Sequence, residues 1–106
     1  MKIRILDVLG IKTGIRIDNV RAEYDEAKEV MKICGRLFKM ENYSKRNHEP
    51  VVMCDLEDRN KRIICCQKGE IYGDIDLLYK TTFSFIIKEF SLIDWKDTSQ
   101  IYLYII

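Results

Sequence analysis

The side chains that most often carry catalysis are few in this chain, and none stands in a familiar pattern. His48 is the only histidine, and it lies in the polar stretch 44–49. A catalytic triad or a histidine general base would have to use it. No Gly-x-Ser-x-Gly elbow and no catalytic-cysteine sequence accompanies it. We therefore expect a solvated loop histidine, no catalytic residue and no enzymatic activity.

The four cysteines invite a redox or metal-binding interpretation. They are Cys34, Cys54, Cys65 and Cys66. No Cys-x-x-Cys pair exists, although structural zinc sites usually need ligands at such paired spacing. Each thiol lies in an apolar stretch, where free cysteine packs like a small hydrophobic residue. We expect four reduced thiols, no bound metal and no other cofactor.

The acidic residues near position 74 offer oxygen atoms of the kind that Mg²⁺ accepts. They are Glu70, Asp74 and Asp76. If a helix begins after Gly73, Asp74 is its N-cap and Asp76 is a first-turn acid that the helix dipole favours. That structural interpretation is preferred to a metal site. The chain also lacks the Walker and Gly-x-Gly-x-x-Gly sequences that cradle nucleotides.

Two basic clusters could contact nucleic acid. One is Lys45 and Arg46, and the other is Arg59, Lys61 and Arg62. In the fold expected below, the clusters lie at opposite ends of the sheet and do not merge into one patch. The chain has 18 basic against 17 acidic residues, whereas dedicated nucleic-acid binders usually carry a basic excess. Nucleic-acid binding is therefore the alternative hypothesis.

Aromatic residues are concentrated near the C-terminus. In an extended strand, Tyr102 and Tyr104 share one face, because successive side chains point to opposite faces. The other face carries Ile101, Leu103 and Ile105. Such a strand is either covered on both faces or exposed for pairing with another chain. We expect a protein interface at Trp95, Tyr102 and Tyr104, formed with a second copy of the chain or with a larger target.

A helix over residues 19–39 is the first element expected to position these groups. Apolar side chains recur there at intervals of four and three residues, which places them on one helical face. The stripe comprises Val20, Tyr24, Ala27, Met31, Cys34 and Phe38. Asn19 would cap the first turn. Acidic residues lie early and basic residues late, which complements the helix dipole.

A strand is expected on the N-terminal side of this helix. Residues 3–9 are rich in β-forming side chains, and residues 15–18 alternate between apolar and polar. A hairpin joined through Gly10 and Gly14 is the preferred interpretation. A single long, bent strand is the alternative.

A second hairpin is expected after the helix. Residues 51–56 and 62–67 form its strands, with the turn centred on Arg59 and Asn60. The alternation chooses a core face that holds both Cys54 and Cys65. The final strand covers residues 101–106.

Residues 74–93 are ambiguous. Apolar side chains from Ile75 to Ile86 sit at helical spacing, and Asp74 suits an N-cap. Residues 81–87, in contrast, are dense in β-branched and aromatic side chains, which favour a strand. A helix is the preferred interpretation.

This succession predicts an α+β fold of the ferredoxin-like, split βαβ type (βαββαβ). Two helices would cover one face of an antiparallel sheet, with an extra N-terminal hairpin strand. A chain of 106 residues suits a single domain over 1–106. Its 47% hydrophobic and 33% charged residues exclude a disordered class. Without a signal-peptide core or a bilayer-spanning apolar run, we expect a cytoplasmic protein with no membrane contact.

The fold hosts many activities and does not settle function. The missing catalytic groups and the aromatic surplus favour a non-enzymatic protein-interaction domain. Small regulators and inhibitors of phage or mobile-element type, which bind a larger protein target, are the class expected. A nucleic-acid-binding or nucleic-acid-processing domain is the alternative. A third hypothesis is a sensor that holds a small molecule between two protomers.

Overall fold

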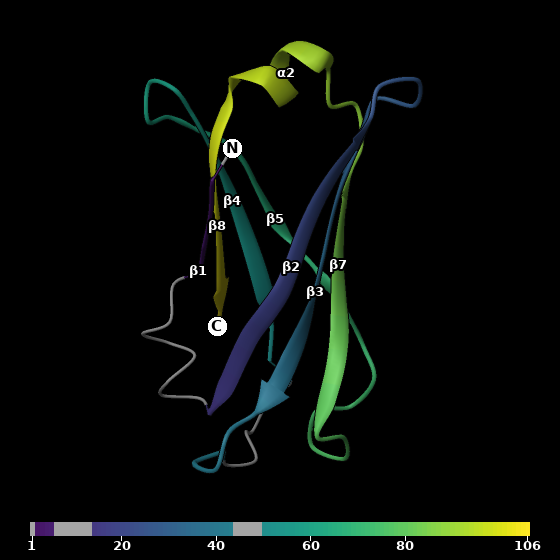
Figure 1. The fold of residues 1–106 in the computed structure, drawn as a ribbon, viewed down its shortest axis with the longest axis vertical. Coiled ribbons are helices and arrows are strands. Elements are labelled where there is room, and N and C mark those ends of the chain that lie inside the picture. Colours follow the sequence, from purple (N-terminus) through teal and green to yellow (C-terminus); the bar gives the residue numbers. More distant parts are fainter. Residues whose placement is uncertain (1, 6–13, 44–49) are drawn as a thin grey trace.

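Two β-sheets dominate the structure. The computed structural model describes residues 2–5, 14–43 and 50–106. In these residues the elements are β1 (Lys2–Ile5), β2 (Ile15–Asp25), β3 (Val30–Lys39), β4 (Val52–Asp58), β5 (Ile63–Lys68), β6 (Glu70–Tyr72), β7 (Lys80–Ile87), α2 (Leu92–Asp97) and β8 (Thr98–Ile105). The first sheet has the strand order β1-β8-β4-β5, and the second has the order β2-β3-β7-β6. The strands run along the long axis, and α2 lies across one end (Figure 1).

The expected ferredoxin-like α+β fold is therefore wrong. Among the described residues there is one short helix rather than two long ones, and two sheets rather than one. The inward side chains of both sheets meet in one hydrophobic core. Leu56 and Leu103 enter it from the first sheet, and Leu37 and Phe85 enter it from the second. Sheet-on-sheet burial, not helix-on-sheet burial, stabilises this fold.

The predicted helix over 19–39 is a hairpin of β2 and β3, joined by a turn at residues 26–29. Its apparent stripe mixed side chains from both faces of two strands. Tyr24 and Met31 pack toward the core, whereas Cys34 and Phe38 lie on the outer face of β3. The turn holds no Gly, Asn or Pro, and Glu29 takes the positive φ of 51° that closes it. Residues 26–29 therefore carry none of the Gly, Asn or Pro that would have indicated a turn in the sequence.

A β-bulge in β2 hid the alternation further. The pairing with β3 shifts between Asp18 and Arg21, and Asn19 has a φ of 50°. Before the bulge the inward side chains are Ile15 and Ile17. After it they are Val20, Ala22 and Tyr24. The switch from odd to even positions breaks the period of two that identifies a strand.

The preferred helix over 74–93 is also wrong. The middle of the segment forms β7, with Thr81, Phe83, Phe85 and Ile87 buried in alternation. The β-branched and aromatic residues of 81–87 were the correct indicator. Asp74 does begin a single helical turn, because its carbonyl accepts hydrogen bonds from the backbone of Leu77 and Leu78.

In the described part of the chain, β1 and β2 do not pair with each other as the predicted N-terminal hairpin requires. β1 pairs in parallel with β8 in the first sheet, with Ile3 opposite Ile101, whereas β2 belongs to the second sheet. Residues 6–13, which would complete that hairpin, lie outside the described residues. The strand prediction for 15–18 is confirmed as the beginning of β2.

The C-terminal strand and the second hairpin are confirmed. β4 pairs with β5 on one side and with β8 on the other. Cys54 lies opposite Gln67 rather than Cys65, so the register differs by two residues from the one expected. A shift of two keeps the same face inward, and Cys54 and Cys65 both contact the core as predicted.

The strand that leaves the hairpin crosses from one sheet to the other at Gly69. Its backbone N–H donates to the carbonyl of Val52 at 2.9 Å, and β6 then begins in the second sheet. A Cβ at Gly69 would lie 2.8 Å from the Phe85 ring and 2.9 Å from a Val52 methyl group. Only glycine fits this crossing between the sheets.

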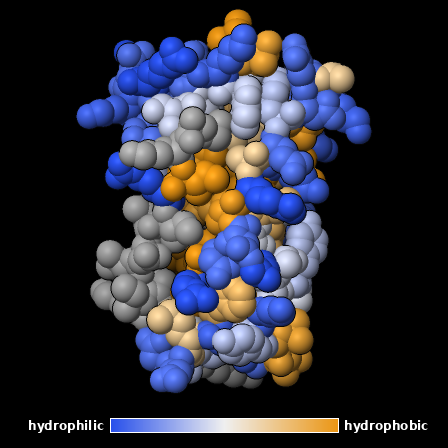
Figure 2. Space-filling model, in the orientation of Figure 1, coloured by the Kyte–Doolittle hydropathy of each residue, from blue (hydrophilic) through white to orange (hydrophobic). Residues whose placement is uncertain are grey.

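Hydrophobic side chains gather along the middle of the face in Figure 2, among hydrophilic residues that cover most of the rest. None of the helices found in the described residues has the length and apolar character needed to cross a membrane. Several large apolar side chains remain exposed in turns, on strands and on α2. The most exposed are Leu77, Tyr79 and Ile93.

Candidate functional site

Tyr102 and Tyr104 lie on the outer face of β8, as the alternation predicted. Both are partly exposed. The Tyr104 hydroxyl donates to Asp55 at 3.1 Å, and the Tyr102 hydroxyl donates to Gln100 at 2.9 Å. Burial and the hydrogen bond with Asp55 raise the pKa of Tyr104 to about 12. Both hydroxyls are thus committed to partners within the first sheet.

Trp95 does not share a face with these tyrosines. It lies on α2 and stacks on Tyr24 of β2, with ring centroids 5.3 Å apart and an interplanar angle of 11°. The Tyr24 hydroxyl in turn donates to the carbonyl of Phe90 at 2.7 Å. The structure therefore does not bring the predicted interface residues Trp95, Tyr102 and Tyr104 together. Their contact with a partner stays a prediction.

The second basic cluster lies in the turn between β4 and β5. The turn is organised by Asp58, whose carboxylate accepts from the backbone N–H of Asn60 and of Arg62, each at 2.9 Å. Arg59 donates to the carbonyl of Lys96 at 3.3 Å. Lys61 and Arg62 are exposed. Lys45, Arg46 and His48 lie outside the described residues, so a patch joining the two clusters stays untested.

The thiols divide into buried and accessible groups, and all four are free. Cys54 is fully buried, and burial raises its pKa to about 12. Cys66 is exposed on the outer face of β5 beside Asp55. Its hydrogen bond with Asp55 raises the Cys66 pKa. No cluster of three or more metal-ligating side chains occurs in the part of the chain that the structure describes.

A groove on the outer face of the second sheet was not anticipated from the sequence. It is open, has a volume of about 760 Å³, and is formed by β2, β3, β6 and β7. Ligand sites commonly span roughly 300–1,000 Å³. We call it the sheet groove. Its lining includes Arg21, Lys32, Arg36, Tyr72, Ser84 and Gly35.

The sheet groove is positively charged. Among the described residues, every charged side chain in its lining is a cation: Arg21, Lys32 or Arg36. Acidic residues stand at its margin, because Glu23 lies opposite Lys32 in the register and Asp18 lies next to Arg36. The lining thus favours anionic groups, and the marginal acids limit how many cations are unpaired.

The bulge in β2 positions the cation at one end of the groove. With its amide oriented to present oxygen, Asn19 accepts a hydrogen bond from Arg36 Nε at 2.7 Å and another from Arg36 Nη2. The guanidinium also lies over the ring of Phe38, 5.2 Å from the centroid. Arg16 covers the same ring at 5.2 Å. The Phe38 ring therefore holds both Arg16 and Arg36, and Asn19 of the bulge holds Arg36 as well.

Hydroxyl groups line the opposite wall of the groove. Tyr72 of β6 and Ser84 of β7 share a hydrogen bond of 2.8 Å between their oxygens. Gly35 lies in β3 next to Arg36, and an added Cβ there would be 2.4 Å from Phe83 Cζ. Glycine lets the Phe83 ring pack directly against the β3 backbone, which forms the floor.

An apolar segment lies next to the sheet groove, immediately before β7 begins. Leu77, Leu78 and Tyr79, which we call the apolar tip, are 81%, 45% and 71% exposed. The tip is fixed by its backbone, since Lys39 N–H donates to the Tyr79 carbonyl at 3.0 Å. The Tyr79 ring meets Phe38 edge-on at 6.2 Å. Phe38 thus connects the apolar tip to Arg36 of the groove.

Sequence reasoning missed these residues for one reason. Arg21, Lys32 and Arg36 fall on the solvated side of the helix expected over 19–39, where charges need no explanation. In a hairpin, alternate residues of β3 share a face, so Lys32, Cys34 and Arg36 line up beside Arg21. The alternation of Met31, Ile33 and Leu37 was the available indicator.

Comparisons of the chain with protein-family models, with curated proteins and with solved structures find no match. Function is therefore inferred from the geometry and charge of the sheet groove.

Proposed function

We propose that this chain is a non-enzymatic protein-interaction domain whose sheet groove binds an acidic, extended segment of a larger protein. The observation that carries the proposal is the cationic lining of the groove, Arg21, Lys32 and Arg36. Arginine is enriched at protein interfaces because its planar guanidinium binds carboxylates through paired hydrogen bonds.

The apolar tip supports a protein rather than a nucleic acid as the partner. Leu77 is 81% exposed, and an aliphatic side chain presented in this way gains free energy only when it is buried against another apolar surface. Continuity of the tip with the groove through Phe38 suits a partner that offers carboxylates next to apolar side chains.

Nucleic-acid binding is the second candidate, since Tyr72 stands beside the cations of the groove and is 51% exposed. Non-specific single-strand binders combine cations with exposed rings on which bases stack. Here the ring of Phe38 is already covered by Arg16 and Arg36, and Phe83 is buried beneath Gly35. Tyr72 is then the accessible ring in the described lining of the groove. A single ring makes a poor platform for stacking successive bases.

We propose a cytoplasmic location, and the four free thiols support it because a reducing compartment keeps thiols unpaired. In that setting we infer a small regulator or inhibitor that acts by occupying its target, with no cofactor and no chemical step. A homodimer formed through Tyr102 and Tyr104 stays a separate prediction, since these residues lie on the other sheet.

The test is a titration of the protein into a short fluorescent peptide of alternating glutamate and leucine. Arg21→Glu and Lys32→Glu should each weaken binding by about five- to tenfold, because each replaces an attraction by a repulsion. Lys61→Glu makes the same charge change in the turn between β4 and β5, outside the groove, and should leave affinity unchanged. Equal losses in all three variants would contradict binding in the groove.

The same titration with a single-stranded oligonucleotide separates the two candidates. A protein partner predicts weak oligonucleotide binding that disappears at physiological salt. Tighter binding of the oligonucleotide than of the peptide, with a steep loss of affinity as salt rises, would favour the second candidate.

A further inference from the structure

We infer that the β2 bulge forms a subsite for a single carboxylate or phosphate group, with Arg36 as its anchor and Asp18 as a competitor built into the chain. This inference deepens the proposed function and rests on it, since the subsite lies at one end of the sheet groove. It names the group of the ligand that docks there and the residue that opposes docking.

The anchor is held ready for an anion. Asn19 occupies the Nε edge of the Arg36 guanidinium, and Phe38 supports one of its faces. A guanidinium fixed on an edge and a face loses little conformational entropy when it binds an anion. The positive φ of Asn19 places its amide here, so the bulge itself builds the subsite.

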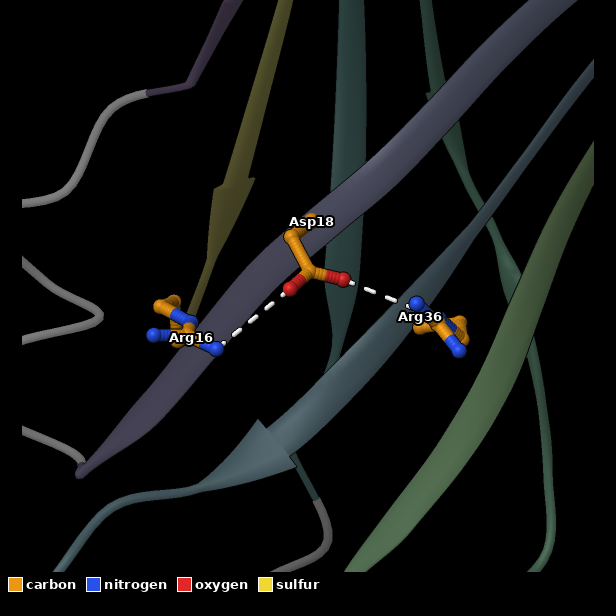
Figure 3. Close-up of polar contacts among 3 residues, drawn as sticks. All are labelled: Arg16, Asp18 and Arg36. Atoms are coloured by element: carbon orange, nitrogen blue, oxygen red, sulfur yellow. Dashed lines mark hydrogen bonds and ion pairs between the residues drawn. The ribbon is translucent and has the colours of Figure 1, made fainter.

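Asp18 already faces Arg36, but the two groups are too far apart for a good ion pair. Figure 3 shows its carboxylate between Arg16 and Arg36, at 3.4 Å from Arg16 Nη2 and 3.7 Å from Arg36 Nε. Charge-assisted hydrogen bonds between such groups are usually near 2.7–2.9 Å. The contact with Arg36 is therefore an attraction without a hydrogen bond.

One oxygen of Asp18 is left unsatisfied by this arrangement. Asp18 Oδ1 is hidden from solvent, and among the described residues it accepts no hydrogen bond. A carboxylate oxygen without a donor costs free energy, since water would have supplied one. A ligand anion that reaches Arg36 directly allows Asp18 to turn toward Arg16 and solvent, where both of its oxygens can be satisfied.

Removal of the charge on Asp18 should therefore strengthen anion binding rather than weaken it. Asp18→Asn keeps the side-chain shape and removes the competing charge. Glu26→Gln makes the same charge change in the exposed turn between β2 and β3, away from the groove, and controls for net charge. Affinity for the glutamate–leucine peptide should rise about two- to fivefold in Asp18→Asn and stay constant in Glu26→Gln.

A second readout isolates the subsite from the peptide. The Nε–H resonance of Arg36 is identified by its loss in Arg36→Lys and followed while inorganic phosphate is added. It should move at lower phosphate concentration in Asp18→Asn than in the parent or in Glu26→Gln. That result supports the subsite even if neither the parent nor Asp18→Asn binds the peptide. In that case the proposed function fails and the subsite stands. The same phosphate response in Asp18→Asn and Glu26→Gln, or a weaker one in Asp18→Asn, overturns the subsite even if the peptide binds.

Discussion

The indole of Trp95 stacks on the phenol ring of Tyr24, with centroids 5.3 Å apart and an angle of 11° between the planes. Trp95 lies on the helix that leads into β8 of the first sheet, whereas Tyr24 belongs to β2 of the second. Tyr24 also meets Phe90 edge-on at 6.2 Å. These three rings connect the two sheets at the end of the molecule where α2 crosses (Figure 1).

Trp95→Ala should lower the free energy of unfolding by about 2–3 kcal/mol, because it removes a partly buried aromatic ring from this connection. Urea denaturation measures the change. Ile93→Ala on the same helix is the control, since Ile93 is 70% exposed, and it should change stability by no more than about 0.5 kcal/mol. Similar losses in the two variants would show that the ring stack is not a structural connection.

Gly35 should not tolerate a side chain. A Cβ there would lie 2.4 Å and 2.6 Å from two atoms of the Phe83 ring. We expect Gly35→Ala to destabilise the fold by about 1–3 kcal/mol, the usual cost of overpacking a core. Thermal denaturation of Gly35→Ala, Phe83→Leu and the double variant checks the cause. The double variant should be less destabilised than the sum of the two, and strict additivity would contradict a steric origin.

The strands β4, β5 and β8 could be predicted because each has its own local indicator, whereas β7 was mistaken for a helix. Val52, Cys54 and Leu56 alternate with half-buried residues, as do Ile101, Leu103 and Ile105. The hairpin of β2 and β3 was interpreted as a helix for physical reasons. The bulge at Asn19 moves the inward side chains from odd to even positions, and the turn before Val30 closes on Glu29 without glycine. With both indicators suppressed, Tyr24, Met31 and Phe38 imitated a helical stripe.

Cys54 should make stability depend on pH in alkaline solution. Its pKa is 9.0 when unperturbed and about 12 in the folded protein. The folded state therefore keeps its proton between these values while the unfolded state loses it, and stability falls as pH rises. Above about pH 10, where the unfolded thiol is mostly ionised and the folded one is not, this thiol contributes a loss of roughly 1 kcal/mol per pH unit.

Cys54→Ala isolates that contribution. The variant is less stable at every pH, because a buried side chain is truncated, but its stability should fall less steeply above pH 9 than that of the parent. Tyr104, whose pKa is also raised, affects both proteins equally. Urea denaturation at several pH values gives the two slopes, and parallel slopes would contradict the burial of Cys54.

Asp55 should control the reactivity of the exposed thiol Cys66. The hydrogen bond with Asp55, then burial and the negative charge of Asp55, raise the Cys66 pKa. Asp55→Asn removes the charge, so the thiolate fraction near pH 8 and the alkylation rate at Cys66 should increase. Mass spectrometry of the Cys66 peptide follows the reaction. Glu57→Gln on the same strand is the control, and an equal increase there would show a general charge effect.

The candidate site was less predictable than the fold, because it depends on which residues share a face. Tyr102 and Tyr104 were placed correctly on one face by alternation alone. Arg21 and Arg36 are fifteen positions apart in the chain, and they line one groove only because β2 and β3 pair with a bulge between them. That pairing cannot be recognised while the segment is interpreted as a helix.

The central claim is that the sheet groove, and not the outer face of the first sheet, contacts an acidic partner. Mapping of backbone amide chemical shifts during titration with the glutamate–leucine peptide tests it most directly. We predict the largest changes at Arg21, Lys32, Arg36 and Ser84, with little change at Tyr102 and Tyr104. Changes centred on Tyr102 and Tyr104, or changes spread evenly over both sheets, would contradict the claim.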